Sequence, residues 1–107
     1  MSGPYINTAR IQAAVTLVEN RKRFKRDAGL IMRHIVEEVG ELSAALYRYE
    51  ASGIIGGSKR TEVGRELIDL ISLSVYMADV LGINLNALYP QRMSEVFAQY
   101  KVREVVP

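Results

Sequence analysis

Two clusters of acidic residues interrupt otherwise apolar segments of this chain. The first contains Glu37, Glu38 and Glu41, and the second contains Glu66 and Asp69. If both segments are helical, residues three apart have Cβ atoms about 5–6 Å from one another. Glu38 then pairs with Glu41, and Glu66 pairs with Asp69. Each pair sets two carboxylates side by side and supplies half of a cation site.

Carboxylates that converge repel one another unless protons or a cation neutralise them, and neither motif places a Lys or Arg between its acids. A coordination sphere rich in carboxylates favours Mg²⁺, with Mn²⁺ as a substitute, whereas zinc and iron sites normally recruit His or Cys. The chain has no Cys, and its one histidine, His34, precedes the acids. Magnesium held in this way keeps positions open for water and phosphate oxygens, which suits phosphoanhydride hydrolysis.

The elements that must position these acids are helices, because no segment alternates apolar and polar residues over a strand length. We expect helices over about 5–26, from 27 or 28 to 52, over about 61–81, and from a start between 85 and 90. The second helix carries apolar residues at helical spacing: Ile31, Ile35, Val39, Leu42 and Leu46. A glycine-rich loop over 53–60 lets the second and third helices pack antiparallel, which brings the acidic pairs together. The prediction is all-α, a small four-helix bundle forming one domain over 1–107.

Two further features bear on ligands and partners. Lys59 and Arg60 fall in the expected loop, where they could close over a triphosphate, although a solvated loop is the favoured interpretation of these two residues. The third helix is apolar around most of its circumference, more than a small bundle covers. It therefore predicts self-association as a homodimer or homotetramer, with Ile71, Val75 or their neighbours facing the partner.

Composition limits the remaining classes. Fourteen Lys and Arg against twelve Asp and Glu leave a net charge of +2, which argues against nucleic acid as a partner despite the basic run over 21–26. The absence of Cys fits a reducing compartment. No signal peptide or membrane-spanning segment is apparent, so the expected location is the cytoplasm, with no membrane partner.

With these motifs the chain resembles the MazG-like all-α nucleoside triphosphate pyrophosphohydrolases. The family pattern is Glu-Glu-x-x-Glu followed by Glu-x-x-Asp, which stands here at 37–41 and 66–69, and the stretch 78–85 is also similar. The likeness covers about 31–93. It implies Mg²⁺-dependent conversion of a nucleoside triphosphate to the monophosphate and pyrophosphate by a dimer or a dimer of dimers.

The resemblance also assigns roles to residues. It implies that Glu38, Glu41, Glu66 and Asp69 bind the metal, and that Glu37 or Glu38 orients the attacking water. Near the C-terminus the family often has a Lys and then an Asn that hold nucleotide. Arg92 stands in place of the Lys and Val96 in place of the Asn, so Arg92 is the candidate substrate contact and the preferred base stays open.

Two alternatives remain at this level. The paired acids also resemble those of phosphoribosyl-ATP pyrophosphohydrolase, an enzyme that likewise releases pyrophosphate. A non-catalytic helical dimerisation module would carry the acids only to keep one face soluble. A Mg²⁺ titration and a nucleotide panel distinguish these alternatives.

Overall fold

The computed structural model describes residues 6–22 and 26–101, and within these ranges the chain is helical with no strand. The helices are α1 (Thr8–Lys22), α2 (Ala28–Ser52), α3 (Gly57–Val80) and α4 (Leu85–Gln99). The all-α prediction is confirmed. None of these described helices is long and apolar enough to cross a membrane.

Helix α2 begins and ends where the sequence predicts. The Asp27 carboxylate accepts a hydrogen bond from the Leu30 backbone N–H at 3.1 Å, which satisfies a free donor of the first turn. At the other end Gly53 has a φ of 68°, and its N–H donates to the Glu50 carbonyl. Glycine adopts this left-handed conformation without the steric cost that a Cβ imposes, so α2 stops at this residue.

The connection to α3 is shorter than expected. Helix α3 already starts at Gly57, and Gly56 precedes it without a side-chain cap. The prediction of a loop over 53–60 is therefore wrong at its C-terminal half, and Lys59 and Arg60 belong to the first turns of α3. The Thr61 hydroxyl donates to the Gly57 carbonyl one turn back.

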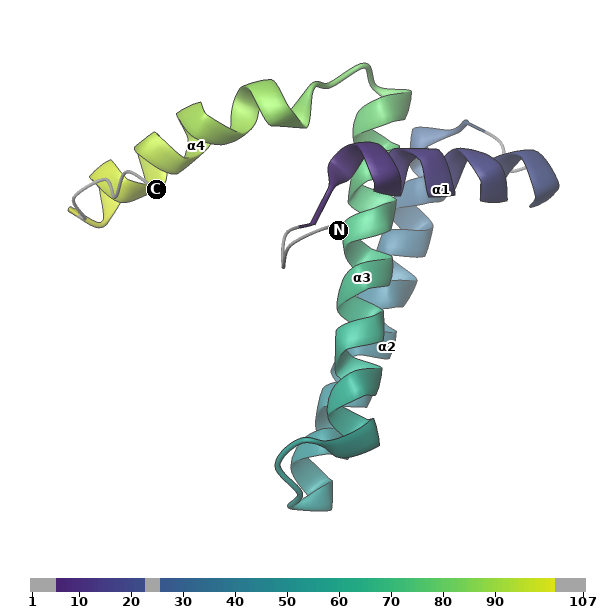
Figure 1. Cartoon of the computed structure of the whole chain (residues 1–107), viewed down its shortest axis with the longest axis vertical. Coiled ribbons are helices and arrows are strands. Elements are labelled where there is room, and N and C mark those ends of the chain that lie inside the picture. Colours follow the sequence, from purple (N-terminus) through teal and green to yellow (C-terminus); the bar gives the residue numbers. More distant parts are fainter. Residues whose placement is uncertain (1–5, 23–25, 102–107) are drawn as a thin grey trace.

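The core lies between α2, α3 and α1. Helices α2 and α3 run side by side and α1 crosses α3 (Figure 1). The buried hydrophobic residues of the described chain are Ile31, Ala45, Val75, Tyr76 and Ala78. Val75 is therefore not open to a partner, contrary to expectation. Val39 and Leu46 are 50% and 44% exposed, although their spacing placed them with Ile31 on one face.

Helix α4 projects away from the α2–α3 hairpin (Figure 1). It contains Pro90 beyond its first turn, where proline cannot donate to the carbonyl four residues earlier. The Cα radius of gyration is 16.4 Å, whereas a compact domain of this length has about 13 Å. The four helices of a single chain therefore do not close around one common core.

Candidate metal centre

Three of the predicted ligands meet between the two helices of the hairpin. Glu38 comes from α2, and Glu66 and Asp69 come from successive turns of α3. One carboxylate oxygen from each lies within 4.8 Å of the other two. Because α2 and α3 are antiparallel neighbours, the pairing of distant sequence motifs follows directly from the hairpin.

Within the described residues, no Lys or Arg ion pair neutralises the three carboxylates of the cluster. Glu38 and Glu66 are half-buried and Asp69 is exposed. One oxygen of Glu38 and one of Glu66 are inaccessible to solvent and have no hydrogen-bond partner. Within the described part of the chain, the ion pairs formed by Lys and Arg involve other acids. Buried oxygen acceptors without partners are costly, and they fit a hard cation well.

The electrostatic consequence appears at Glu38. Burial, followed by a hydrogen bond with Glu66, raises the pKa of this carboxyl from 4.5 to about 7. The charges of Glu41, Asp69 and Glu66 act in the same direction. A divalent cation in the cluster would reverse this effect, because it favours the ionised form.

The other two acids of the first motif are placed differently. Glu41 is exposed and is not among the three residues that converge, although its charge acts on Glu38. Glu37 is also exposed, and its carboxylate lies 3.4 Å from Nδ1 of His34 one turn earlier on α2. The structure thus joins three of the four predicted ligands and directs Glu37 toward His34.

Glu62 is an acid that the sequence motifs did not single out. It precedes Glu66 by one turn, so the two share a face of α3. The Arg48 Nε of α2 lies 3.5 Å from one Glu62 oxygen, and Lys59 Nζ lies 3.9 Å from the other. Glu62 is neutralised by cations while Glu38, Glu66 and Asp69 are not. The sequence feature that could have identified Glu62 is its position four residues before Glu66, which places both acids on one face of α3.

The predicted substrate contacts lie outside the cluster. Lys59 and Arg60 precede Glu66 by six or seven residues, roughly 10 Å along the axis of α3. Arg92 lies on the projecting helix α4, where its guanidinium pairs with Glu95 at 3.1 Å. Within one chain the structure does not bring Arg92 to the carboxylates.

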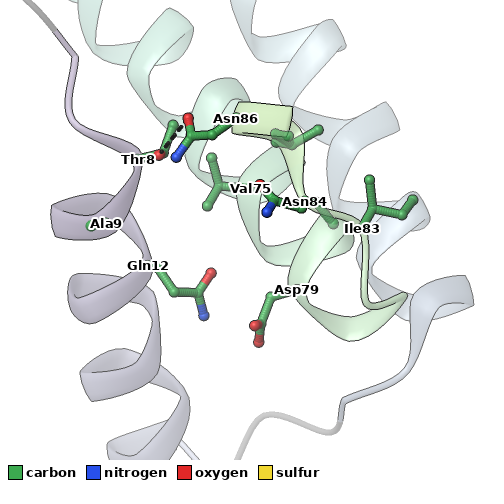
Figure 2. A pocket seen from close by; sticks show the side chains of 10 residues that line it. Thr8, Ala9, Gln12, Val75, Asp79, Ile83, Asn84 and Asn86 are labelled. Atoms are coloured by element: carbon green, nitrogen blue, oxygen red, sulfur yellow. Dashed lines mark hydrogen bonds between the residues drawn. The ribbon is translucent and has the colours of Figure 1, made fainter. Parts of the chain in front are cut away.

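A hollow of about 270 Å³ lies where α1 meets the α3–α4 turn, and Figure 2 shows its polar side chains. These polar side chains already form hydrogen bonds or ion pairs within the fold. The Thr8 hydroxyl donates to the Asn86 side-chain oxygen at 3.3 Å, and Asn84 caps α4. Asp79 pairs with Arg26 at 2.8 Å. We interpret this hollow as the junction that holds α1 and the root of α4 on α3.

Comparison with protein-family models, curated proteins and solved structures finds no match. These comparisons give no support to a MazG-like assignment, which stays a prediction from the two acidic motifs and their flanks.

Proposed function

We propose that this protein is a Mg²⁺-dependent nucleoside triphosphate pyrophosphohydrolase, which converts a (d)NTP and water to the (d)NMP and pyrophosphate. The observation that supports it most is the convergence of Glu38, Glu66 and Asp69, two of which carry a buried oxygen without a partner. The resemblance of the two acidic motifs to the MazG-like enzymes favours this reaction among those that use magnesium.

In this proposal the three converging carboxylates hold the metal, and Glu41 joins them through a rotation of its exposed side chain. Bound Mg²⁺ supplies charge neutralisation for the phosphates and lowers the pKa of water. Glu38, with Glu37 beside it, orients the water that attacks the α-phosphorus. The resemblance implies Arg92 as a contact to the triphosphate, and this residue would come from an assembly larger than one chain. Lys59 and Arg60 stay candidate contacts because of their charge, although they lie in α3 and not in a loop.

The proposed functional unit is a homodimer or homotetramer in the cytoplasm. Exposed apolar residues support self-association, among them Val36 at 60% and Leu88 at 50% of their surface. Contiguous exposed apolar surface on a protein often marks an interaction site.

The test is a panel of canonical and damaged nucleotides and phosphoribosyl-ATP, each assayed with Mg²⁺ and with EDTA. Pyrophosphate and a monophosphate from at least one (d)NTP are expected, only with metal. Asp69→Asn should abolish the reaction. Glu50→Gln, which removes an exposed acid in the last turn of α2, should leave the reaction intact.

The alternatives give different results in the same panel. Cleavage restricted to phosphoribosyl-ATP would identify the histidine-biosynthetic reaction. Orthophosphate and a diphosphate as products would exclude attack on the α-phosphorus. No turnover and no Mg²⁺ binding would leave the non-catalytic dimerisation module.

A further inference from the structure

His34 contacts an acid of the first motif that lies outside the metal cluster. Its Nδ1 is 3.4 Å from Oε2 of Glu37, one turn later on α2. The imidazole is the better covered partner, since 34% of the His34 side chain is exposed against 67% of the Glu37 side chain. A protonated imidazole nitrogen can donate to a carboxylate oxygen, and such contacts are often long before a substrate binds. The less mobile imidazole can therefore restrain the carboxylate.

The contact draws the Glu37 carboxylate around α2 toward Glu38. At 100° per residue, Glu37 lies about 100° from Glu38 around the helix axis. His34 precedes Glu38 by four residues, which places it only about 40° from Glu38, on the same side as Glu37. A Glu37 side chain that reaches His34 therefore bends toward the helix face that carries the proposed metal ligand. Side chains on a helix lean toward its N-terminus, which favours contact with the preceding turn.

On α3, Asp69 lies on the same side of the hairpin and at the same end of the cluster. Asp69 is about 60° from Glu66, in the rotational sense that leads from Glu38 to His34. Because α2 and α3 are antiparallel and Glu38 faces Glu66, equal rotational senses point to one side of the hairpin. Asp69 is also about 4.5 Å further along α3 than Glu66, which is toward the N-terminal end of α2 and so toward His34. The Glu37 carboxylate is thus held beside the Asp69 edge of the cluster.

The contact occupies one oxygen of Glu37 and leaves the other for a different partner. Because Nδ1 of His34 approaches Oε2, Oε1 can accept a hydrogen bond from a water molecule at the edge of the cluster. An unrestrained glutamate on a helix surface samples many rotamers. A carboxylate that is fixed through one oxygen presents the other in a defined direction, which is what the orientation of a nucleophile requires.

A surface ion pair without a function leads to a different expectation. Pairs between exposed charged side chains contribute little to stability. If His34 and Glu37 form only such a pair, loss of the imidazole changes neither folding nor turnover. If the contact positions Glu37 for the reaction, turnover falls while folding and metal binding stay unchanged.

We propose that His34 is a positioning residue, which holds the Glu37 carboxylate at the Asp69 edge of the metal cluster so that its second oxygen orients the attacking water. This role rests on the proposed pyrophosphohydrolase function. The imidazole contacts neither metal nor substrate and acts only through Glu37. A single side chain of α2 then determines whether the exposed acid of the first motif takes part in the reaction.

Steady-state kinetics on the nucleotide that the panel identifies, combined with Mn²⁺ binding, tests the proposal. His34→Ala should lower kcat about tenfold or more, with the KM and the Mn²⁺ Kd unchanged. Its helicity by circular dichroism should match wild type, because alanine is the best helix former. His34→Asn, whose side-chain amide can donate from near the position of Nδ1, should recover most of the lost kcat. The matched control is Arg33→Gln, which changes the neighbouring exposed side chain and should leave kcat unchanged.

Glu37→Ala shows whether the imidazole acts through Glu37. In this background, His34→Ala should lower kcat by less than about twofold, because the group that it positions is already absent. An equal loss of kcat in both backgrounds would overturn the proposal. Unchanged kcat in His34→Ala, or a raised Mn²⁺ Kd in that variant, would also overturn it.

A second measurement needs no turnover. The chain has one histidine, so the ¹⁵N magnetic resonance signals of its imidazole need no assignment. Neutral His34 should carry its proton on Nδ1 more often in wild type than in Glu37→Ala, because the carboxylate accepts from that nitrogen. Turnover without this tautomer difference would refute the role of His34 alone. The tautomer difference without turnover of any nucleotide would refute the proposed function, and the role of His34 with it.

Discussion

At the scale of residues, Glu62 and Glu66 show how neighbouring acids on one helix face can differ in role. Arg48 and Lys59 lie within 4 Å of the Glu62 carboxylate, so this acid has its counter-charges within the protein. Glu62 and Glu66 each have one buried oxygen without a hydrogen-bond partner, but Glu66 shares its surroundings with the acids Glu38 and Asp69 instead of with cations. The second environment is unfavourable for the metal-free protein and favourable for a cation.

Asp69→Asn should therefore separate stability from function. Removing one negative charge relieves repulsion, so in EDTA the variant should melt at or above the wild-type temperature. Mg²⁺ at about ten times its Kd should stabilise wild type by RT ln 11, about 1.4 kcal/mol, and the variant by much less. Thermal melts with EDTA and with Mg²⁺ measure both effects. A variant that melts well below wild type in EDTA and responds equally to Mg²⁺ would make Asp69 a structural residue.

The raised pKa of Glu38 predicts a pH dependence for the metal-free protein. Protonated Glu38 favours the folded state, so its contribution to the free energy of unfolding is complete below about pH 4.5. That contribution is lost as the pH rises through about 7. In EDTA, Glu38→Gln should match wild type at pH 5 and melt above it at pH 8. A difference in melting temperature that does not change with pH would refute this electrostatic explanation.

At the scale of elements, local signals predicted the helices, whereas packing partners depended on information outside each segment. Asp27 and Gly53 bounded α2 correctly because their chemistry is visible in the sequence. The start of α3 was placed too late because Gly57 begins the helix without a side-chain cap.

The carboxylate cluster was predicted in part for a related reason. Residues three apart on a helix differ by about 60° around its axis. The spacing shows that Glu38 and Glu41 are neighbours but not how α2 is rotated against α3. The observed rotation turns Glu38 into the hairpin and leaves Glu41 exposed. The same rotation leaves Val39 and Leu46 exposed, which periodicity alone assigned to the core side.

Loss of the N-cap should affect a larger part of the fold when the cap belongs to α2 than when it belongs to α4. Asp27→Ala removes the bond to the Leu30 N–H and should lower the free energy of unfolding by about 1 kcal/mol, because α2 forms the core with α3. Asn84→Ala removes the equivalent bond to the Ala87 N–H. Hydrogen exchange, measured at a concentration where the chain is monomeric, should accelerate across α2 and α3 in the first variant and within α4 in the second. Equal acceleration across α2 in both variants would show that α4 is part of the hairpin's cooperative unit.

At the scale of the whole molecule, the fold is the α2–α3 hairpin, against which α1 packs more extensively than α4 does. Helix α1 packs against α3, and its Thr8 donates to Asn86 in the first turn of α4, whereas the rest of α4 leaves the hairpin (Figure 1). The radius of gyration follows from this arrangement. The three proposed metal ligands, Glu38, Glu66 and Asp69, lie between α2 and α3 and do not depend on the position of α4.

Direct metal binding tests the central claim, that Glu38, Glu66 and Asp69 form a divalent-cation site. Electron paramagnetic resonance of free Mn²⁺, titrated with protein in the absence of nucleotide, reports binding without relying on the identity of the substrate. We expect saturable Mn²⁺ binding that Mg²⁺ displaces, that Glu66→Gln weakens at least about tenfold, and that Glu50→Gln preserves. Binding that is absent in wild type, or that Glu66→Gln and Glu50→Gln reduce equally, would contradict the claim.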